Sequence, residues 1–231
     1  MSPTSIPTGT AFKSGNAFLE RAYSLQSESE AKALYDEWAS TYDADLAGED
    51  YMSPTAAVTA LAHHLDENVS STPAPSSLTI LDAGCGTGLV GLALKTSHRL
   101  RDAVAAVDGV DLSQGMLDVA RKAGVYRELR TADLTKALDC EDGKYDAVLC
   151  VGTLTKGHVG PEVLGEFVRV VKKEGGLVVA TVLSEIWVEG GFERVVEELR
   201  KEGRAEVLGA EEFGIRKGEE KGGRMLVLRK L

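Results

Sequence analysis

Residues 78–88 read Leu-Thr-Ile-Leu-Asp-Ala-Gly-Cys-Gly-Thr-Gly, and this stretch decides the fold of the chain. Its apolar half, residues 78–81, has the length and composition of a buried strand that stops at the acidic Asp82. The glycines at 84, 86 and 88 allow a tight turn with positive φ, and the apolar run from Leu89 predicts a helix. A ligand can lie almost on the main chain at such a turn, with helix amide groups pointing toward it. The stretch therefore predicts a nucleotide-like ligand.

Residues 86–91 also fit the dinucleotide-binding pattern G-x-G-x-x-G by letter. In that pattern the first glycine directly follows the strand, so that a pyrophosphate meets the helix N-terminus. Here residues 82–85 separate the strand from Gly86, and the carboxylate of Asp82 would repel a pyrophosphate. An acid at the strand tip suits instead a ligand that carries an ammonium or a sulfonium group. A nicotinamide oxidoreductase is the alternative hypothesis.

The string Leu-Asp-Ala-Gly-Cys-Gly-Thr-Gly, residues 81–88, resembles motif I of the class I S-adenosylmethionine (SAM) methyltransferases. The resemblance implies a Rossmann-like α/β fold: a mostly parallel seven-stranded sheet with an antiparallel last strand, helices on both faces and an N-terminal helical lid. It also implies SAM as the cofactor. The motif residues expected to bind it are Asp82, Gly84, Cys85, Gly86, Thr87 and Gly88.

A second strand is predicted at residues 103–110, ending in Asp111. A strand, a helix and a strand in this order form a βαβ unit, so Asp111 should lie beside the glycine turn, where ligands bind in open α/β sheets. Both carboxylate oxygens can accept hydrogen bonds from a ribose diol. Asp108, inside the apolar run, is a poorer match for this role. Leu112 and Met116 would pack against an adenine ring or, alternatively, only into the core.

The segment before motif I, residues 29–69, predicts a helical lid. Tyr35, Trp38 and Tyr42 share one helical face from Ser29 onward, which an amphipathic helix with aromatic core anchors would also explain. The string Tyr35-Asp-Glu-Trp-Ala-Ser-Thr-Tyr42-Asp resembles a segment of many small-molecule methyltransferases, and this implies that the three aromatic residues help to enclose SAM.

The segments around the lid are predicted from their composition. Ser53 and Pro54 suit the start of a second helix, and the Ser- and Pro-rich residues 70–77 predict a linker. Residues 1–28 are expected to be flexible, with a short helix conceivable at about 16–26, and residues 29–231 to form one domain.

Further strands are predicted at residues 126–131, 145–150 and 177–183, followed by a closing pair at 205–208 and 225–228 joined by a long charged loop. Helices are predicted from Ser113 to Gly124, from Pro161 and from Phe192. Ala132 and Asp133 follow the third strand and Val151 the fourth, so all three are candidate cofactor contacts. The resemblance implies that Asp133 binds the adenine amino group; a surface turn would equally explain an acid there.

His158 is the candidate catalytic residue, because its side chain titrates near neutrality and it lies on the predicted loop after the fourth strand. Its role would be acceptor base or substrate ligand, with a structural histidine as the alternative. The segment Gly157-His-Val-Gly-Pro161, with Gly124-Val-Tyr126 and the aromatic string, resembles the methyltransferase-like proteins of the Williams–Beuren-region type. Residues 151–154 lack the (N/D)-P-P-(Y/F) string of amino-methylating enzymes, and Cys150 is interpreted as a strand residue.

These features predict a methyltransferase acting on a small-molecule acceptor, which the lid and residues 184–191 would select. A SAM-binding regulatory protein without transfer activity is the alternative from another class. The net charge of −10 argues against a nucleic-acid partner. The apolar runs are too short to span a membrane. With no basic-then-apolar leader and three cysteines outside any C-x-x-C pair, we expect a cytoplasmic protein without a metal site, as monomer or homodimer.

Overall fold

The computed structural model describes residues 16–22, 24–25, 28–67, 77–173 and 175–231. The helices are α1 (Ala17–Ala22), α2 (Glu28–Trp38), α3 (Tyr42–Gly48), α4 (Ser53–Glu67), α5 (Leu89–Thr96), α6 (Gln114–Ala123), α7 (Val163–Val170), the 3-10 helix η1 (Ser184–Ile186) and α8 (Phe192–Lys201). The strands are β1 (Leu78–Ala83), β2 (Val104–Asp111), β3 (Glu128–Thr131), β4 (Ala147–Leu154), β5 (Leu177–Leu183), β6 (Ala205–Gly214) and β7 (Gly222–Lys230). Most of the predicted linker and residues 1–15 lie outside the described residues, whereas part of the N-terminal segment forms α1.

The described strands form one seven-stranded sheet in the order β3-β2-β1-β4-β5-β7-β6. Strands β1 to β5 pair in parallel, and β7 is antiparallel to both of its neighbours, β5 and β6. The predicted fold class is therefore confirmed. The chain moves outward from β1 to β3 and then returns to β4 on the other side of β1, and ligands bind at such a reversal in open α/β sheets.

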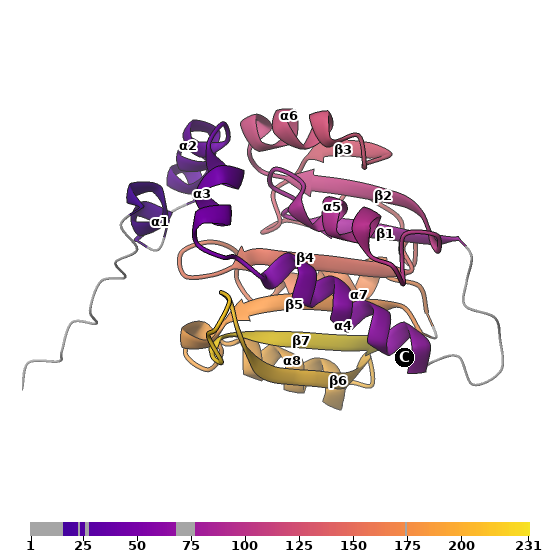
Figure 1. Ribbon diagram of the computed structural model, residues 1–231. Helices are drawn as coiled ribbons and strands as arrows, with labels where there is room; N and C mark the ends of the chain where they lie inside the picture. The colour runs from indigo at the N-terminus through magenta and orange to yellow at the C-terminus, as the bar shows by residue number, and fades with distance from the viewer. Residues whose placement is uncertain (1–15, 23, 26–27, 68–76, 174) are drawn as a thin grey trace, which may run out of the picture.

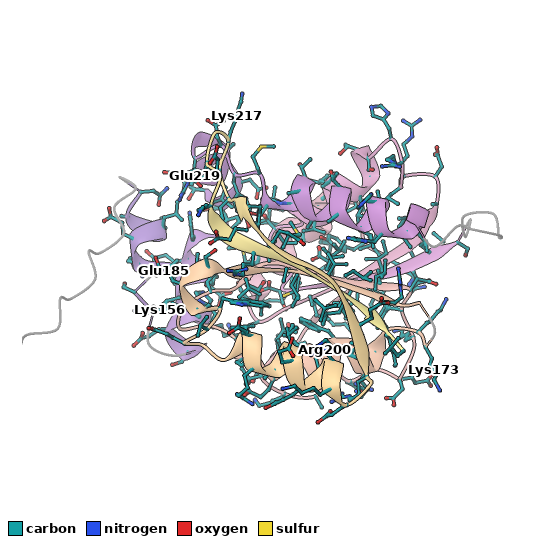
Figure 2. The ribbon with its side chains drawn as sticks, turned by 90° about the horizontal axis from the view of Figure 1, so that it is seen from below. Lys156, Lys173, Glu185, Arg200, Lys217 and Glu219 are labelled. Atoms are coloured by element: carbon teal, nitrogen blue, oxygen red, sulfur yellow. The ribbon has the colours of Figure 1, made fainter. Side chains whose placement is uncertain are left out.

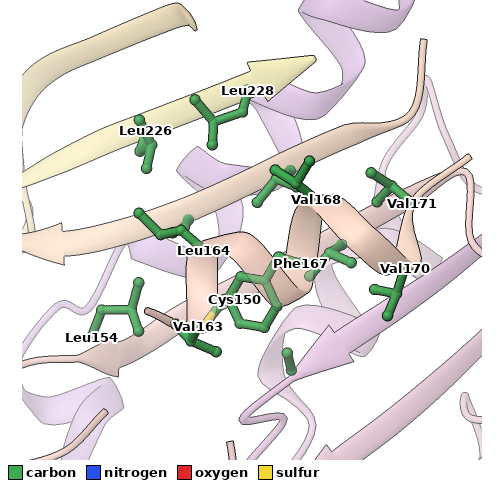
Figure 3. Close-up of a cluster of buried hydrophobic side chains, with 14 of the residues drawn as sticks. Cys150, Leu154, Val163, Leu164, Phe167, Val168, Val170, Val171, Leu226 and Leu228 are labelled. Carbon is green, nitrogen blue, oxygen red and sulfur yellow. The ribbon is translucent and has the colours of Figure 1, made fainter. Parts of the chain in front are cut away.

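Helices cover both faces of the sheet (Figure 1), and an apolar core lies between the helices and the sheet on each face. On one face α7 and α8 pack on the sheet, and Figure 3 shows Phe167 and Leu164 of α7 among Cys150 of β4 and Leu226 and Leu228 of β7. These side chains are all fully buried. On the other face α4 and α5 contribute the apolar side chains that cover β1, β4 and β5. The parallel strands are thus buried on both faces, as their continuous apolar sequences require.

A third apolar cluster lies within helices α1, α2 and α3, here named the lid helices. Leu19 and Ala22 of α1 and Leu34 and Trp38 of α2 are buried in it. In Figure 1 the lid helices lie at the end of the sheet toward which the arrowheads of β2, β4 and β5 point. They therefore lie at the carboxyl ends of the parallel strands.

The spacing of Tyr35, Trp38 and Tyr42 predicts one continuous helix, but in the structure these residues lie on two helices. Helix α2 ends at Trp38 and Tyr42 begins α3, because Ser40 and Thr41 favour a turn over a helix interior. The Thr41 amide donates to the Trp38 carbonyl, and the Trp38 indole donates to Asp45 Oδ2 at 2.6 Å. These contacts close the turn and fold α3 back on α2.

Strand β4 extends further than predicted, through Leu154, so Val151 belongs to the strand and not to a loop. Gly152 lies within it at φ +75°, where the register with β5 shifts. Its amide donates to the Thr181 hydroxyl at 2.9 Å, which replaces the lost ladder bond. The Thr181 hydroxyl on β5 therefore allows β4 to continue past Gly152, although the sequence predicts a loop there.

Two further strands differ from their predicted lengths. Strand β3 begins at Glu128, and Tyr126, before it, packs over the sheet with its hydroxyl donating to Asp82 of β1. Strands β6 and β7 are about twice as long as predicted, and the segment between them, residues 215–221, is charged as predicted but shorter than the predicted loop. Charges that face solvent on edge strand β6 pair across the hairpin, with Glu206 3.0 Å from Arg229. Such charges discourage edge-to-edge association of sheets. They also interrupt the apolar pattern by which a strand is predicted from sequence.

Candidate functional site

The glycine turn joins β1 to α5 at the carboxyl end of the sheet. Gly84, Gly86 and Gly88 have φ of +74°, +53° and +100°, which residues with a Cβ rarely adopt. A Cβ at Gly84 would overlap the Thr153 hydroxyl, whereas one at Gly86 would meet nothing within 4 Å. Gly86 therefore presents open main chain to the space in front of the turn.

Asp111, at the end of β2, holds the glycine turn because its carboxylate binds a main-chain amide of the turn. Its Oδ2 accepts a hydrogen bond from the Gly86 amide at 2.8 Å and its Oδ1 accepts one from the Ser113 amide at 2.9 Å. Burial raises the pKa of Asp111, and the backbone hydrogen bonds oppose that rise. Each oxygen keeps a second lone pair for a ligand hydroxyl. The competing acid Asp108 lies elsewhere, buried against Arg127 at 2.6 Å.

Asp82 lies beneath the turn and not in the wall of a cavity. Its side chain is fully buried; Oδ2 accepts a hydrogen bond from the Tyr126 hydroxyl at 2.7 Å, and Oδ1 has no partner among the described residues. Burial raises the pKa of Asp82 to about 7. A buried carboxylate oxygen without a donor is costly unless a ligand supplies one.

Tyr126 reaches Asp82 through a slot that three glycines leave open. A Cβ added at Gly91 would lie 2.8 Å from the Tyr126 ring, one at Gly109 3.0 Å and one at Gly88 3.1 Å. The absence of these side chains on α5, β2 and the turn therefore admits the ring. Sequence reasoning missed this role, although the Gly124-Val-Tyr126 segment stands out in the sequence.

The remaining residues of motif I lie inside the protein. Cys85 is buried, and Thr87 is buried with its hydroxyl donating to Asp43 of α3 in a short hydrogen bond. Gly88 begins α5. None of these three lines a cavity described below, so they support the turn and its contact with the lid helices.

The aromatic residues of the lid pack on one another over the turn. The Tyr42 ring contacts the Trp38 ring edge to face at a centroid distance of 4.6 Å, and Tyr35 lies 6.3 Å from Tyr42. Trp38 is only 1% exposed and its indole N–H is already bonded within the lid. The structure therefore brings Tyr35 and Tyr42 to the cavity in front of the turn, whereas the buried Trp38 does not line that cavity and lines only the second cavity described below.

Asp36 fastens the lid to the N-terminus of α6. Its Oδ1 accepts hydrogen bonds from the Ser113 hydroxyl at 2.5 Å and from the Gly115 amide at 3.0 Å. Burial would raise the pKa of Asp36, but these bonds and Lys32 together lower it. Sequence reasoning missed Asp36, although it follows Tyr35 directly in the aromatic string.

His158 and Tyr35 form a pair between the sheet and the lid. The His158 Nε2 lies 3.0 Å from the Tyr35 hydroxyl, and its Nδ1 lies 3.0 Å from the Lys156 carbonyl and 2.8 Å from the Thr155 hydroxyl. Because a carbonyl oxygen can only accept, Nδ1 carries the proton and Nε2 accepts from the tyrosine. Burial lowers the pKa of His158, which favours the neutral imidazole that this arrangement needs.

An open cavity of about 760 Å³, the first cavity, lies in front of the turn. Its wall contains eleven of the predicted site residues, from five parts of the chain: Tyr35, Tyr42, Gly84, Gly86, Asp111, Leu112, Met116, Ala132, Asp133, Val151 and His158. It also contains residues that the sequence did not single out as ligand contacts: Ala31, Lys32, Ser113, Leu134, Thr135, Gly152, Thr153 and Val159.

The wall of the first cavity carries more acid than base. The wall contains Asp111 and Asp133 and, as the sole lysine or arginine among its described residues, Lys32, which is paired with Asp36 at 2.6 Å. The Asp133 carboxylate accepts from the Thr135 amide at 3.0 Å and from Lys136 at 2.6 Å. The site therefore suits a ligand with positive charge and offers no free cation to a phosphate.

A second cavity of about 730 Å³ shares Tyr35, Tyr42 and Gly152 with the first. The rest of its wall comes from the lid helices, the ends of β4 and β5, and the β6–β7 hairpin: Leu19, Ala22, Trp38, Leu46, Glu49, Tyr51, Ser53, Thr155, Thr181, Val182, Leu183, Phe213, Ile215, Arg216 and Gly223. Residues 184–191, which were predicted to select the acceptor, line neither cavity.

Comparison with known proteins places the chain among methyltransferases. A family model described as a methyltransferase domain matches residues 80–175. The chain is 36% identical over 179 residues to methyltransferase-like protein 27 of Homo sapiens, covering 76% of this chain and 68% of that protein. It is 37% identical over 101 residues to a demethylmenaquinone methyltransferase of Symbiobacterium thermophilum, covering 42% of this chain and 39% of that protein.

Solved structures show the same fold at low sequence identity. The [4+2]-cyclase SpnF superposes with a TM-score of 0.60 at 18% identity, over 89% of this chain and 97% of that one. Within the described ranges, the helices are all too short or too polar to cross a membrane. The same residues contain no cluster of three or more His, Cys, Asp or Glu side chains that could hold a metal ion.

Proposed function

Because this chain belongs to the class I SAM-dependent methyltransferases, we propose that it transfers the methyl group of SAM to a small-molecule acceptor. The membership rests on the relative that is 36% identical and of which the chain covers more than two thirds. The fold by itself does not specify the reaction, as its likeness to a cyclase illustrates. The proposal therefore depends on the residues of the site.

The hydrogen bond from the Gly86 amide to Asp111 is the main structural support for SAM as the cofactor rather than a dinucleotide. In a turn that holds a pyrophosphate, the amide groups are free to donate to phosphate oxygens. Here a carboxylate oxygen 2.8 Å away occupies the Gly86 amide, so a phosphate would meet a like charge. A cofactor with a ribose diol and a sulfonium meets hydroxyl acceptors and a favourable charge instead. This argues against the nicotinamide alternative.

The residues present fit SAM in three ways. Asp111 would accept hydrogen bonds from the ribose, and Asp133 would accept one from the adenine amino group, with Leu112 and Met116 beside the ring. Gly86 would let the cofactor lie on the main chain, since a Cβ there would point into open space. Asp82 lies beneath the turn with its Oδ1 unpartnered among the described residues, and the negative charge of its ionised form would favour the ammonium group of the methionine part.

When bound, SAM supplies a methyl carbon already activated by its sulfonium sulfur. The chain then has to orient the acceptor, exclude water and, where the acceptor carries a proton, remove it. The lid helices close over the turn through Asp43 and Asp36, and so exclude water. Tyr35 and His158 are placed to take the proton, because Tyr35 lines both cavities and its hydroxyl donates to a neutral imidazole.

Calorimetric titration of the full chain with S-adenosylhomocysteine (SAH) and with NAD tests the cofactor. We expect saturable binding of SAH, none of NAD, and an SAH affinity lowered at least about tenfold in Asp111→Ala. Asp118→Ala is the matched control, because Asp118 is an exposed acid on α6 that pairs with Arg121. NAD binding, or an Asp111→Ala variant that binds SAH like the parent, would overturn the proposal.

A second experiment separates an enzyme from a regulatory protein. The chain is incubated with SAM labelled in the methyl group and a fractionated metabolite extract, and methylated products are identified by mass. A labelled small molecule that depends on the intact chain supports the transferase. Tight SAM binding without any labelled product across the fractions would favour the regulatory alternative.

A further inference from the structure

The second cavity adjoins the proposed cofactor site, with which it shares three lining residues, and has a different chemical character. We propose that it binds the methyl acceptor, and that this acceptor is an uncharged aromatic alcohol; the inference rests on the proposed function. The two cavities meet at Tyr35, Tyr42 and Gly152. An acceptor in the second cavity is therefore next to the place where the methyl group would be presented.

The wall of the second cavity is mainly apolar and rich in rings. Tyr51 and Phe213 add to the aromatic residues of the lid, and Leu46, Val182 and Leu183 supply aliphatic surface. Flat rings stack on such walls, and an apolar surface of this kind offers few partners to a polar chain. The composition of the wall favours an aromatic acceptor.

Two glycines bring the aromatic side chains into this wall. A Cβ at Gly152 would lie 2.6 Å from the Tyr51 hydroxyl, and one at Gly223 would lie 2.6 Å from the Phe213 ring. Any side chain at either glycine would displace a ring that lines the cavity. The two glycines thus leave the space that the Tyr51 and Phe213 rings occupy in the wall of the second cavity.

The charges of this cavity exclude an anionic acceptor. Among the described residues that line this cavity, Arg216 is the sole lysine or arginine, and its guanidinium lies 3.3 Å from Glu49 and 3.4 Å from Glu219. Two carboxylates therefore already neutralise it and leave a net negative charge. A carboxylate on the acceptor would lose its hydration without gaining a free cation, which is costly. A neutral acceptor avoids this cost.

The Tyr35–His158 pair indicates a hydroxyl group on the acceptor. An amine attacks through its lone pair before it loses a proton, whereas a hydroxyl needs a base during attack. As the bond between the acceptor oxygen and the methyl carbon forms and the carbon–sulfur bond breaks, the hydroxyl proton passes to Tyr35 Oη. The Tyr35 proton passes to His158 Nε2, 3.0 Å away, and the products are a methyl ether, SAH and a protonated histidine.

Titrations with two naphthols test the acceptor class. The probes are 2-naphthol and 6-hydroxy-2-naphthoate, which differ by one carboxylate, each added with and without saturating SAH. We expect saturable binding of 2-naphthol, binding of the naphthoate weaker by about tenfold or more, and formation of 2-methoxynaphthalene when SAM is supplied. Failure of 2-naphthol to bind, or equal binding of the naphthoate, overturns the inference.

Variants of the hairpin locate the binding. Ile215→Trp fills the second cavity and should abolish 2-naphthol binding, whereas Lys217→Trp, on the exposed tip of the same hairpin (Figure 2), should not. SAH affinity, unchanged in both, shows that both variants are folded. If Ile215→Trp does not fold, Phe213→Ala should weaken 2-naphthol binding at unchanged SAH affinity. If these hairpin changes leave 2-naphthol binding unaffected, the second cavity is not the acceptor site and the inference is overturned. If the parent chain does not bind SAH, the proposed function is overturned instead.

Discussion

Asp82 combines complete burial with an oxygen that has no hydrogen-bond donor, and this makes its ionisation a measurable property. Burial raises its pKa from the ordinary value of 3.8 to about 7, although the Tyr126 hydroxyl opposes the shift. The folded chain therefore binds a proton at Asp82 over a pH range in which the unfolded chain has lost it. The stability linked to this proton is fully present below pH 3.8 and is lost as the pH rises through about 7.

We expect Asp82→Asn to remove this pH dependence. The difference in unfolding free energy between the variant and the parent should grow with pH between about 4 and about 7, by at most about 4 kcal/mol. Urea unfolding of both proteins across this range measures it. Asp118→Asn, a change at an exposed acid, should leave the slope unaltered, and parallel curves for Asp82→Asn and the parent would contradict the prediction.

His158 gives the second prediction at the scale of a residue. His158→Ala should lower turnover of a hydroxyl acceptor by about 10²-fold or more at unchanged SAH affinity, because the proposed base is lost but the proposed cofactor contacts at Asp111 and Asp133 remain. Burial lowers the pKa of His158, so turnover by the parent should fall only on acidification below the ordinary value of 6.5. The exposed His98 serves as control through His98→Ala. Full turnover in His158→Ala would remove His158 from the mechanism.

Single residues differ in how well the sequence alone predicts them. The N-cap role of Ser113 is confirmed, since its hydroxyl accepts from the Met116 amide, and local spacing suffices to predict such a contact. The placement of Asp111 beside the turn follows from βαβ geometry. The partnership of Tyr126 with Asp82 could not be predicted in this way, because it depends on three glycines from separate elements meeting in space.

Among the helices and strands, α5 shows how a glycine can be required by packing and not by the backbone. Gly91 lies inside α5, where glycine usually weakens a helix. A Cβ there would lie 2.7 Å from Val125 and 2.8 Å from Tyr126. The helix therefore gives up some intrinsic stability to admit the tyrosine that reaches Asp82.

We expect Gly91→Ala to destabilise the chain by about 1–3 kcal/mol through this overlap. Gly165→Ala is the matched control: Gly165 lies inside α7, and a Cβ there would approach nothing closer than 3.6 Å, at the flexible end of Arg204. That change should be neutral or should stabilise by about 1 kcal/mol. Thermal or urea unfolding of both variants measures the difference, and equal effects would show that Tyr126 does not fill the space.

The elements with uniform burial were predicted best. Strand β5 has the predicted bounds, because all of its side chains are buried and its sequence is continuously apolar. Strands β4 and β6 were predicted too short, the first because it passes through Gly152 and the second because Gly209 and the acidic residues 211 and 212 interrupt its apolar sequence at the edge of the sheet. Tertiary partners that no local pattern contains decide these cases.

At the scale of the whole molecule, the lid helices are fastened on two sides of the cavities. Asp36 binds the N-terminus of α6 on one side. On the other side the Met52 amide donates to the Ile215 carbonyl at 2.9 Å and the Lys217 amide donates to the Asp50 carbonyl at 3.0 Å. The lid helices and the segment that follows them, residues 49–52, are thus connected to elements near opposite edges of the sheet, and loosening one connection should free the lid locally.

We expect Asp36→Ala to speed amide hydrogen exchange in α2 while exchange in β4 and β5 stays unchanged, because the lid contributes a separate apolar cluster. SAH should also dissociate faster. The neighbouring Glu37→Ala removes only an exposed pair with Arg21 and is the control. Hydrogen exchange read by mass spectrometry tests this, and equal protection of α2 in both variants would contradict it.

The hairpin of β6 and β7 and the lid helices come from opposite extremes of the chain, yet together they enclose the second cavity. The long central part between them builds the turn and its acids. Replacement of both outer segments together should therefore change which acceptor the protein binds and leave its SAM site unaltered. A hybrid that takes both segments from a relative should inherit that relative's preference, whereas a hybrid with one of them should accept neither compound.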